Sequence, residues 1–122
     1  MVLADDHPEM VAKVRRTIGE EFEIVGTVAD GNQAVNAVLT LDPDVLVLDI
    51  SMPIMDGISA AKQLQAANCR AKIVFLTIQN DRDYVAAAIS AGALGYVTKG
   101  RLSYDLAIAI HEVLRGHAFV SP

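Results

Sequence analysis

Short apolar runs alternate with helical segments along this chain of 122 residues. The apolar runs are typical of β-strands, and the segments between them repeat apolar residues at the three- and four-residue spacing of amphipathic helices. Strands joined by helices pair in parallel through right-handed crossovers, with helices on both faces. The run from Val45 to Leu48 contains no polar residue, as expected of a strand buried on both faces. The sequence therefore predicts an α/β fold, a single doubly wound (βα)5 domain with a flavodoxin-like, parallel five-stranded sheet in the order 2-1-3-4-5.

The expected strands cover residues 2–5, 22–29, 45–49, 72–77 and 95–98. Pro8 suits the first turn of the first helix, Pro43 ends the second, and Gly92 ends the fourth. Only three residues separate Met1 from Asp5, so we expect the first strand to be poorly anchored.

Composition excludes several classes of protein. With 52% hydrophobic and 20% charged residues, the chain is expected to fold compactly. The net charge of −5 argues against nucleic-acid binding by this segment itself. The apolar runs are too short for a membrane helix, and no signal peptide is visible. The single Cys69 cannot form an internal disulfide, which together with the missing signal peptide predicts a cytoplasmic protein. The short apolar runs predict that it does not contact the membrane.

Polar side chains lie where four of the expected strands end. Asp5 and Asp6 lie at the end of the first strand, Asp49 at the end of the third, Thr77 of the fourth and Lys99 of the last. Ligands of open α/β sheets bind beyond the carboxyl ends of the strands, so these residues should meet there. Three carboxylates and one ammonium leave a charge of −2, and two like charges ~4 Å apart cost roughly 4 kcal/mol at an effective dielectric of 20. A divalent cation offsets that repulsion, and oxygen donors suit Mg²⁺, or Mn²⁺ in its place.

Asp49 is the candidate nucleophile of this site. Its central position leaves the Asp5 and Asp6 pair to hold a metal that polarises a phosphoryl group for attack by the carboxylate. Thr77 and Lys99 could then bind the phosphoryl oxygens. Simpler alternatives exist for single residues, since Asp5 or Asp6 could cap the first helix and Lys99 could be a solvated charge. Their joint occurrence at four strand ends favours a site.

Four sequence elements resemble the signature of response regulator receiver domains of bacterial two-component systems. They read LADDH at 3–7, VLVLDISMPIMDG at 45–57, FLT at 75–77 and GALGYVTK at 92–99. The ending Gly-x-x-Phe-Val-Ser-Pro is similar to the NarL/FixJ-type subgroup, in which the receiver precedes a LuxR-type helix-turn-helix DNA-binding domain. Residues 1–122 are therefore expected to form one receiver domain, with a DNA-binding domain outside this segment.

This resemblance implies roles for the residues around Asp49. Asp49 would accept a phosphoryl group from a sensor histidine kinase, or from a small donor such as acetyl phosphate. Asp6, Asp49 and the backbone carbonyl of Ser51 would bind Mg²⁺, and Asp5 would help through a bound water. The domain would not be an enzyme beyond this self-phosphorylation and its autodephosphorylation.

The resemblance also implies a conformational switch. Thr77 and Lys99 would bind the phosphoryl oxygens, and movement of Thr77 would let the Tyr96 ring turn inward. Phosphorylation would promote homodimer formation and so control transcription. DNA would be contacted only through the C-terminal domain.

Several positions depart from the family pattern. Ile78 stands where many receivers carry a small residue, and we expect it to gate the access of small donors. Gln79 and Ser51 occupy positions that would tune the phosphoryl lifetime. Gly100 replaces a common proline after Lys99, so the turn must be held differently and we expect a looser Lys99 backbone.

The sequence leaves other functions open. The chain could be a stand-alone receiver for phosphotransfer or protein–protein signalling, or a degenerate receiver that only dimerises. A phosphatase of the haloacid dehalogenase type would need a second acid where Ser51 stands. A nucleotide binder would need a glycine-rich loop where residues 5–8 lie. His7, His111 and His117 are expected to be surface or packing residues, since no metal-binding spacing links them.

Overall fold

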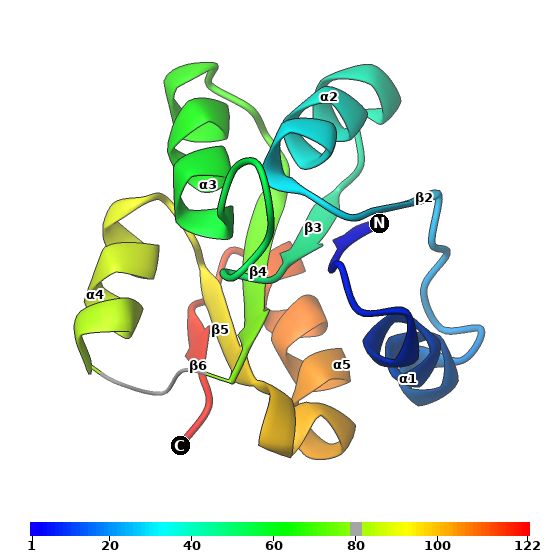
Figure 1. The fold of residues 1–122 in the computed structure, drawn as a ribbon. Coiled ribbons are helices and arrows are strands. Elements are labelled where there is room, and N and C mark those ends of the chain that lie inside the picture. The colour runs from blue at the N-terminus through cyan, green and yellow to red at the C-terminus, as the bar shows by residue number, and fades with distance from the viewer. Residues whose placement is uncertain (79–81) are drawn as a thin grey trace.

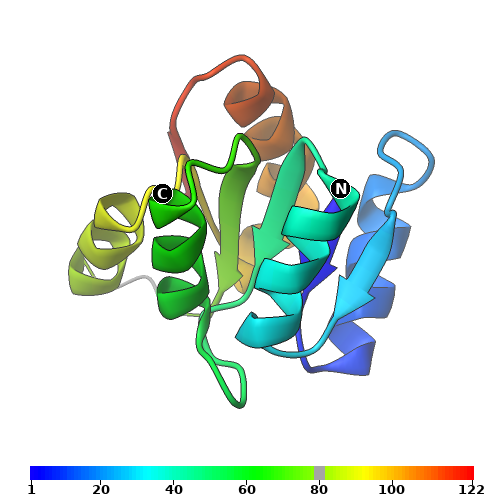
Figure 2. The same cartoon turned by 90° about the horizontal axis from the view of Figure 1, so that it is seen from above.

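Six strands form one parallel sheet in the computed structural model, which describes residues 1–78 and 82–122. Their order is β2-β1-β3-β4-β5-β6, so the predicted fold class and the order of the first five strands are confirmed. The strands are β1 (Val2–Ala4), β2 (Gly26–Val28), β3 (Val45–Leu48), β4 (Lys72–Thr77), β5 (Gly95–Thr98) and β6 (Phe119–Val120). All five pairings are parallel, and Figure 2 shows the strands side by side.

Helices cover both faces of this sheet, as Figure 1 shows. They are α1 (Pro8–Ile18), α2 (Gly31–Leu41), α3 (Gly57–Ala66), α4 (Arg82–Ser90) and α5 (Leu102–Leu114). A short 3₁₀ helix, η1 (Lys99–Arg101), joins β5 to α5. Helices α1 and α5 pack on one face, while α2, α3 and α4 pack on the other.

Within the described ranges, no helix is both long enough and apolar enough to cross a membrane.

Local sequence signals explain where the helices begin. The side chain of Asp30 accepts a hydrogen bond from the Gln33 amide, and that of Asp56 accepts one from the Ser59 amide, each at 2.7 Å. Such N-caps contribute about 1 kcal/mol each. Pro8 begins α1, where its missing N–H has no intrahelical partner to lose.

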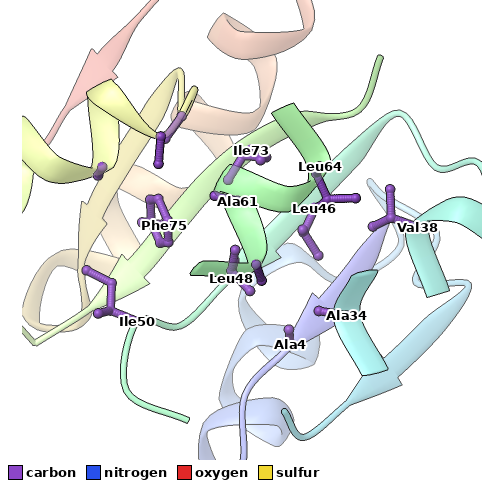
Figure 3. Packing of buried hydrophobic residues seen from close by; sticks show 14 of the residues in the cluster. Ala4, Ala34, Val38, Leu46, Leu48, Ile50, Ala61, Leu64, Ile73 and Phe75 are labelled. Carbon is purple, nitrogen blue, oxygen red and sulfur yellow. The ribbon is translucent and has the colours of Figure 1, made fainter. Parts of the chain in front are cut away.

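Two apolar clusters, one on each face of the sheet, hold the layers together. Figure 3 shows the cluster under α2 and α3, where Leu46 and Phe75 of the sheet pack with Val38 and Leu64 of the helices. Tyr96 also belongs to this cluster, and only 2% of its surface is exposed. Full burial of a side chain of leucine size contributes roughly 1.5–3 kcal/mol to folding stability. Many such side chains hold the helices on the sheet and so keep the strand ends in place.

The first strand is firmly anchored, so the expectation of a loose β1 was wrong. Val2, Leu3 and Ala4 are 0%, 1% and 0% exposed. Strand β1 pairs with β2 on one side and with β3 on the other. The Val25 amide also donates to the Met1 carbonyl at 2.9 Å. A central position in the sheet compensates for the shortness of the strand.

Strand β2 is shorter than the predicted range 22–29, and β6 was not predicted. Phe22 and Ile24 precede β2 and pack against the apolar cluster under α1 and α5, which takes them out of the sheet. Strand β6 lies at the edge of the sheet and pairs with β5 through the register Gly95↔Phe119 and Tyr96↔Val120.

The loop after β3 is tied closely to the strand ends. The Gly57 amide donates to the Ile50 carbonyl at 2.8 Å, and the Asp49 amide donates to the Ala4 carbonyl at 2.9 Å. A Cβ atom added to Gly57 would lie 2.0 Å from the Asp49 carbonyl oxygen. Only glycine permits this approach of α3 to the backbone of Asp49.

We predict that Gly57→Ala destabilises the protein. The clash with backbone atoms should cost at least about 2 kcal/mol, which outweighs the helix propensity that alanine gains. Urea unfolding measures the difference. Gly100→Ala is the matched control, because nothing lies within 4 Å of its added Cβ atom. Equal stability of the two variants would contradict the role assigned to Gly57.

Candidate functional site

The structure brings the predicted charged residues together at the carboxyl edge of the sheet. Lys99 Nζ lies 3.1 Å from Asp5 Oδ2 and 3.2 Å from Asp49 Oδ2, to which it donates a hydrogen bond. Asp5 and Asp49 meet because β1 and β3 are neighbours, with Ala4 in register with Leu48. Residues that are distant in sequence therefore form one ion-paired cluster.

Burial makes the electrostatics of this cluster strong. Asp5 and Asp49 are 4% and 3% exposed, and the Lys99 side chain is 11% exposed. Burial raises the pKa of Asp49; the Asp5 charge acts in the same direction and Lys99 opposes it. Burial alone would lower the pKa of Lys99, but the close carboxylates of Asp5 and Asp49 raise it overall. The ammonium thus stays charged and partly compensates the two carboxylates.

His7 belongs to the same cluster, although no metal-binding spacing links it to the other histidines. Its Nδ1 lies 3.1 Å from both Asp5 Oδ1 and Asp6 Oδ1. A hydrogen bond to Asp5 raises the pKa of His7, and the Asp6 charge adds to this effect. The only signal in the sequence was its position directly after two acids at a strand end.

Helix capping by Asp5 or Asp6, the simpler alternative, is wrong. His7 is the N-cap residue of α1, and among the described residues no side-chain capping hydrogen bond is present there. Asp5 Oδ1 instead accepts a hydrogen bond from the His7 backbone amide at 2.9 Å. The two carboxylates are directed to the cluster and not to the helix.

The donor atoms of this cluster fit a divalent cation. One ligand atom from each of Asp5, Asp6, His7 and Asp49 lies within 4.8 Å of the others. In the described part of the chain, the buried atoms Asp5 Oδ2 and Asp6 Oδ1 have no hydrogen-bond partner, although each lies near a basic nitrogen. Buried oxygens without a donor are unfavourable, and hard cations such as Mg²⁺ bind carboxylate oxygens readily.

The remaining predicted residues lie around this cluster. Ser51 and Ile78 line a pocket of about 280 Å³ with Asp49 and Lys99. The Ile78 side chain is prominent there, since 75% of the residue is exposed. Metal binding by the Ser51 carbonyl and gating of small donors by Ile78 stay predictions. Gln79 lies outside the described residues.

The two predicted switch residues are both buried. Thr77 ends β4, is 1% exposed and lies in register with Thr98. The Tyr96 ring is already inward, within the apolar cluster under α2, α3 and α4. Thr77 ends the strand beside β5, and Tyr96 lies on β5 itself, which leads to Lys99. The switch roles of both residues stay predictions.

Comparisons with known proteins agree on one family. The family model for the response regulator receiver domain matches residues 1–111. The nitrate/nitrite response regulator protein NarL of Escherichia coli is 31% identical over 123 residues, which cover 99% of this chain and 57% of NarL. The chain spans about half the length of the curated relatives it matches.

Solved structures give the same result. A two-component response regulator of the LuxR family from Aurantimonas is 32% identical with a TM-score of 0.93, over 99% of this chain and 88% of that one. The non-phosphorylated receiver domain of the stress response regulator RcsB from E. coli is 28% identical with a TM-score of 0.89, over 99% and 96% of the two chains.

We predict that His7 titrates above its ordinary pKa of 6.5 in the metal-free protein. A raised pKa in the folded state contributes stability that is fully present below pH 6.5 and is lost as the pH rises through the raised value. NMR titration of the ring protons measures the pKa. Thermal unfolding across the same pH range should show this loss in the wild type and not in His7→Gln. A His7 pKa at or below 6.5 would contradict the contacts with Asp5 and Asp6.

Proposed function

Because this chain belongs to the response regulator receiver family, we propose that it is a phosphoacceptor switch of a two-component system. Asp49 is the proposed site of phosphorylation. Its main support is the buried Asp49 carboxylate, which shares the Lys99 ammonium with Asp5. Response regulators are signalling proteins and not metabolic enzymes.

In the proposed reaction, an Asp49 carboxylate oxygen attacks the phosphorus of a phosphohistidine on a sensor histidine kinase. The new O–P bond forms as the P–N bond breaks, and the donor imidazole leaves with its electron pair. Acetyl phosphate would react similarly, with acetate as the leaving group. Hydrolysis of the acyl phosphate by water would return Asp49 to its carboxylate, which is the proposed autodephosphorylation.

Asp6, Asp49 and the Ser51 carbonyl would hold the Mg²⁺, with Asp5 assisting through a water. When bound, the metal supplies positive charge that shields the phosphoryl oxygens from the attacking carboxylate. Two observations support this assignment. Among the described residues, the buried Asp5 Oδ2 and Asp6 Oδ1 atoms have no hydrogen-bond partner, and ligand atoms of the cluster residues lie within 4.8 Å of one another. Mn²⁺ could take the place of Mg²⁺, since it accepts the same oxygen ligands.

Lys99 would change partners when Asp49 is phosphorylated. In the unmodified site its ammonium is shared by Asp5 and Asp49. The phosphoryl oxygens carry close to two negative charges and would draw the ammonium toward them. Thr77, at the end of the neighbouring strand, would bind another phosphoryl oxygen. Such a local change of charge can bias a two-state element, here Thr77 with Tyr96.

The surface of α4 and α5 is the proposed contact surface that responds to phosphorylation of Asp49. Tyr84 and Ile89 of α4 and Tyr104 of α5 are 41%, 57% and 73% exposed. Where such side chains form one contiguous patch, they commonly mark a contact surface. We therefore propose that phosphorylation promotes pairing of two receivers through the surface that these residues form.

Control of transcription is the proposed output. The RcsB response regulator, 29% identical over 98% of this chain and 62% of its own length, has been solved in complex with DNA. The net charge of −5 makes a direct DNA contact by this segment unfavourable. DNA binding would therefore fall to a separate domain, in the cytoplasm.

We expect one phosphoryl adduct on the wild-type chain after incubation with acetyl phosphate and Mg²⁺, detected by intact mass. Asp49→Asn should carry none, because an amide is a poor nucleophile, and a chelator should prevent labelling of the wild type. Asp44→Asn, at the opposite end of β3, is the matched control and should label normally. An adduct on Asp49→Asn would disprove the assignment.

Ile78→Ala is expected to speed labelling by acetyl phosphate several-fold, because the large exposed side chain lines the pocket that the donor must enter. The initial rate of adduct formation measures this effect. Ile108→Ala removes an isoleucine of α5 that is 52% exposed and serves as the control. The same rate for Ile78→Ala and the wild type would remove the gating role.

A further inference from the structure

The turn that carries Lys99 is held in place despite the glycine that follows it. Residues Lys99–Arg101 form η1, and the Lys99 side chain is only 11% exposed. The turn at Gly100 is thus a 3₁₀ helix, and a looser Lys99 backbone stays a prediction. The structure shows what replaces the stiffness that a proline would give.

One buried carboxylate lies at the centre of this arrangement. Asp105 of α5 is 4% exposed, and its Oδ2 accepts hydrogen bonds from Arg101 Nε and from the Ser121 hydroxyl, both at 2.8 Å. Arg101 Nη2 donates to Asp105 Oδ1 at 3.3 Å. The Arg101 guanidinium holds the pKa of Asp105 below its usual range, against the effect of burial and together with the Ser121 hydroxyl. Asp105 is thus a charged and satisfied buried group.

Ser121 reaches Asp105 because β6 docks beside β5. The Phe119 amide donates to the Leu94 carbonyl at 3.0 Å, and the Ser121 amide donates to the Tyr96 carbonyl at 2.8 Å. The Thr98 amide, two residues further along β5, donates to the Ser121 hydroxyl at 3.2 Å. A side chain thus continues the hydrogen bonding of the strand pair up to the residue before Lys99, and Figure 1 shows the two strands side by side.

The turn is consequently fixed on both sides of Lys99. Before Lys99, the Thr98 amide is bound to Ser121; after it, Arg101 is bound to Asp105, and Ser121 joins the two. A lysine side chain is flexible, and ordering it costs conformational entropy. A fixed backbone at Lys99 restricts the positions that its ammonium can reach, and so favours its contacts with Asp5 and Asp49.

We propose that Asp105 and Ser121 are positioning residues for Lys99, and that docking of β6 and binding of a phosphoryl group at Asp49 favour each other. The second part rests on the proposed function of the Asp49 site. Coupling between two sites is reciprocal, so a phosphoryl analogue that engages Lys99 should also stabilise β6. A purely structural network would stabilise the fold and leave the site unchanged.

The first test needs no phosphoryl donor. Amide hydrogen exchange is compared for the wild type, Ser121→Ala, Ser121→Thr and Ser103→Ala, the last being an exposed serine of α5. Loss of one hydrogen bond should speed exchange at residues 98–101 by between about twofold and tenfold in Ser121→Ala. Ser121→Thr keeps the hydroxyl and should resemble the wild type, as should Ser103→Ala. Unchanged exchange at 98–101 in Ser121→Ala would overturn the positioning role.

The second test measures the coupling. Beryllium fluoride with Mg²⁺ should slow exchange of the Phe119 and Ser121 amides in the wild type, and this effect should vanish in Lys99→Ala. Adduct formation from acetyl phosphate should be about twofold to tenfold slower in Ser121→Ala and restored in Ser121→Thr. A wild-type rate in Ser121→Ala would overturn the coupling while Asp49 labelling still stands. Failure of the wild type to label would refute the proposed function, and the first test would still decide the positioning role.

Discussion

The ammonium of Lys99 lies between the carboxylates of Asp5 and Asp49, and this shared ion pair depends on the topology of the whole sheet. The three residues follow β5, β1 and β3, which are far apart in the sequence. A parallel sheet with β1 next to β3 places their carboxyl ends at one edge. Every apolar contact that fixes the strands therefore also fixes the distances within the site.

The site carries more negative charge than its lysine can balance. Asp6 and His7 extend the cluster toward solvent, while Asp5 and Asp49 are buried. Burial strengthens each electrostatic interaction and also makes orphan oxygens unfavourable. The unmodified domain therefore keeps a local excess of negative charge that a divalent cation would relieve. Such excess at a functional site is a common cause of lower stability in exchange for activity.

The sequence predicted the convergence of the acids and Lys99, because each follows a strongly apolar strand and the βα alternation determines the topology. It did not predict β6 or the network around Asp105. A two-residue strand has no periodic pattern, and an aspartate in a helix resembles an ordinary solvated charge. The anchoring of β1 was also missed, because it comes from the two neighbouring strands. These three features depend on tertiary contacts. The predicted strands, and the site residues at their ends, could be recognised from local sequence pattern.

Binding of Mg²⁺ tests most directly whether this edge of the sheet is a metal site. Isothermal titration should show a single site in the wild type and in Asp44→Asn, which alters an exposed acid at the far end of β3. Asp6→Asn should bind at least about tenfold more weakly, because it loses a charged oxygen ligand. Equal Mg²⁺ affinity of Asp6→Asn and the wild type would contradict the account.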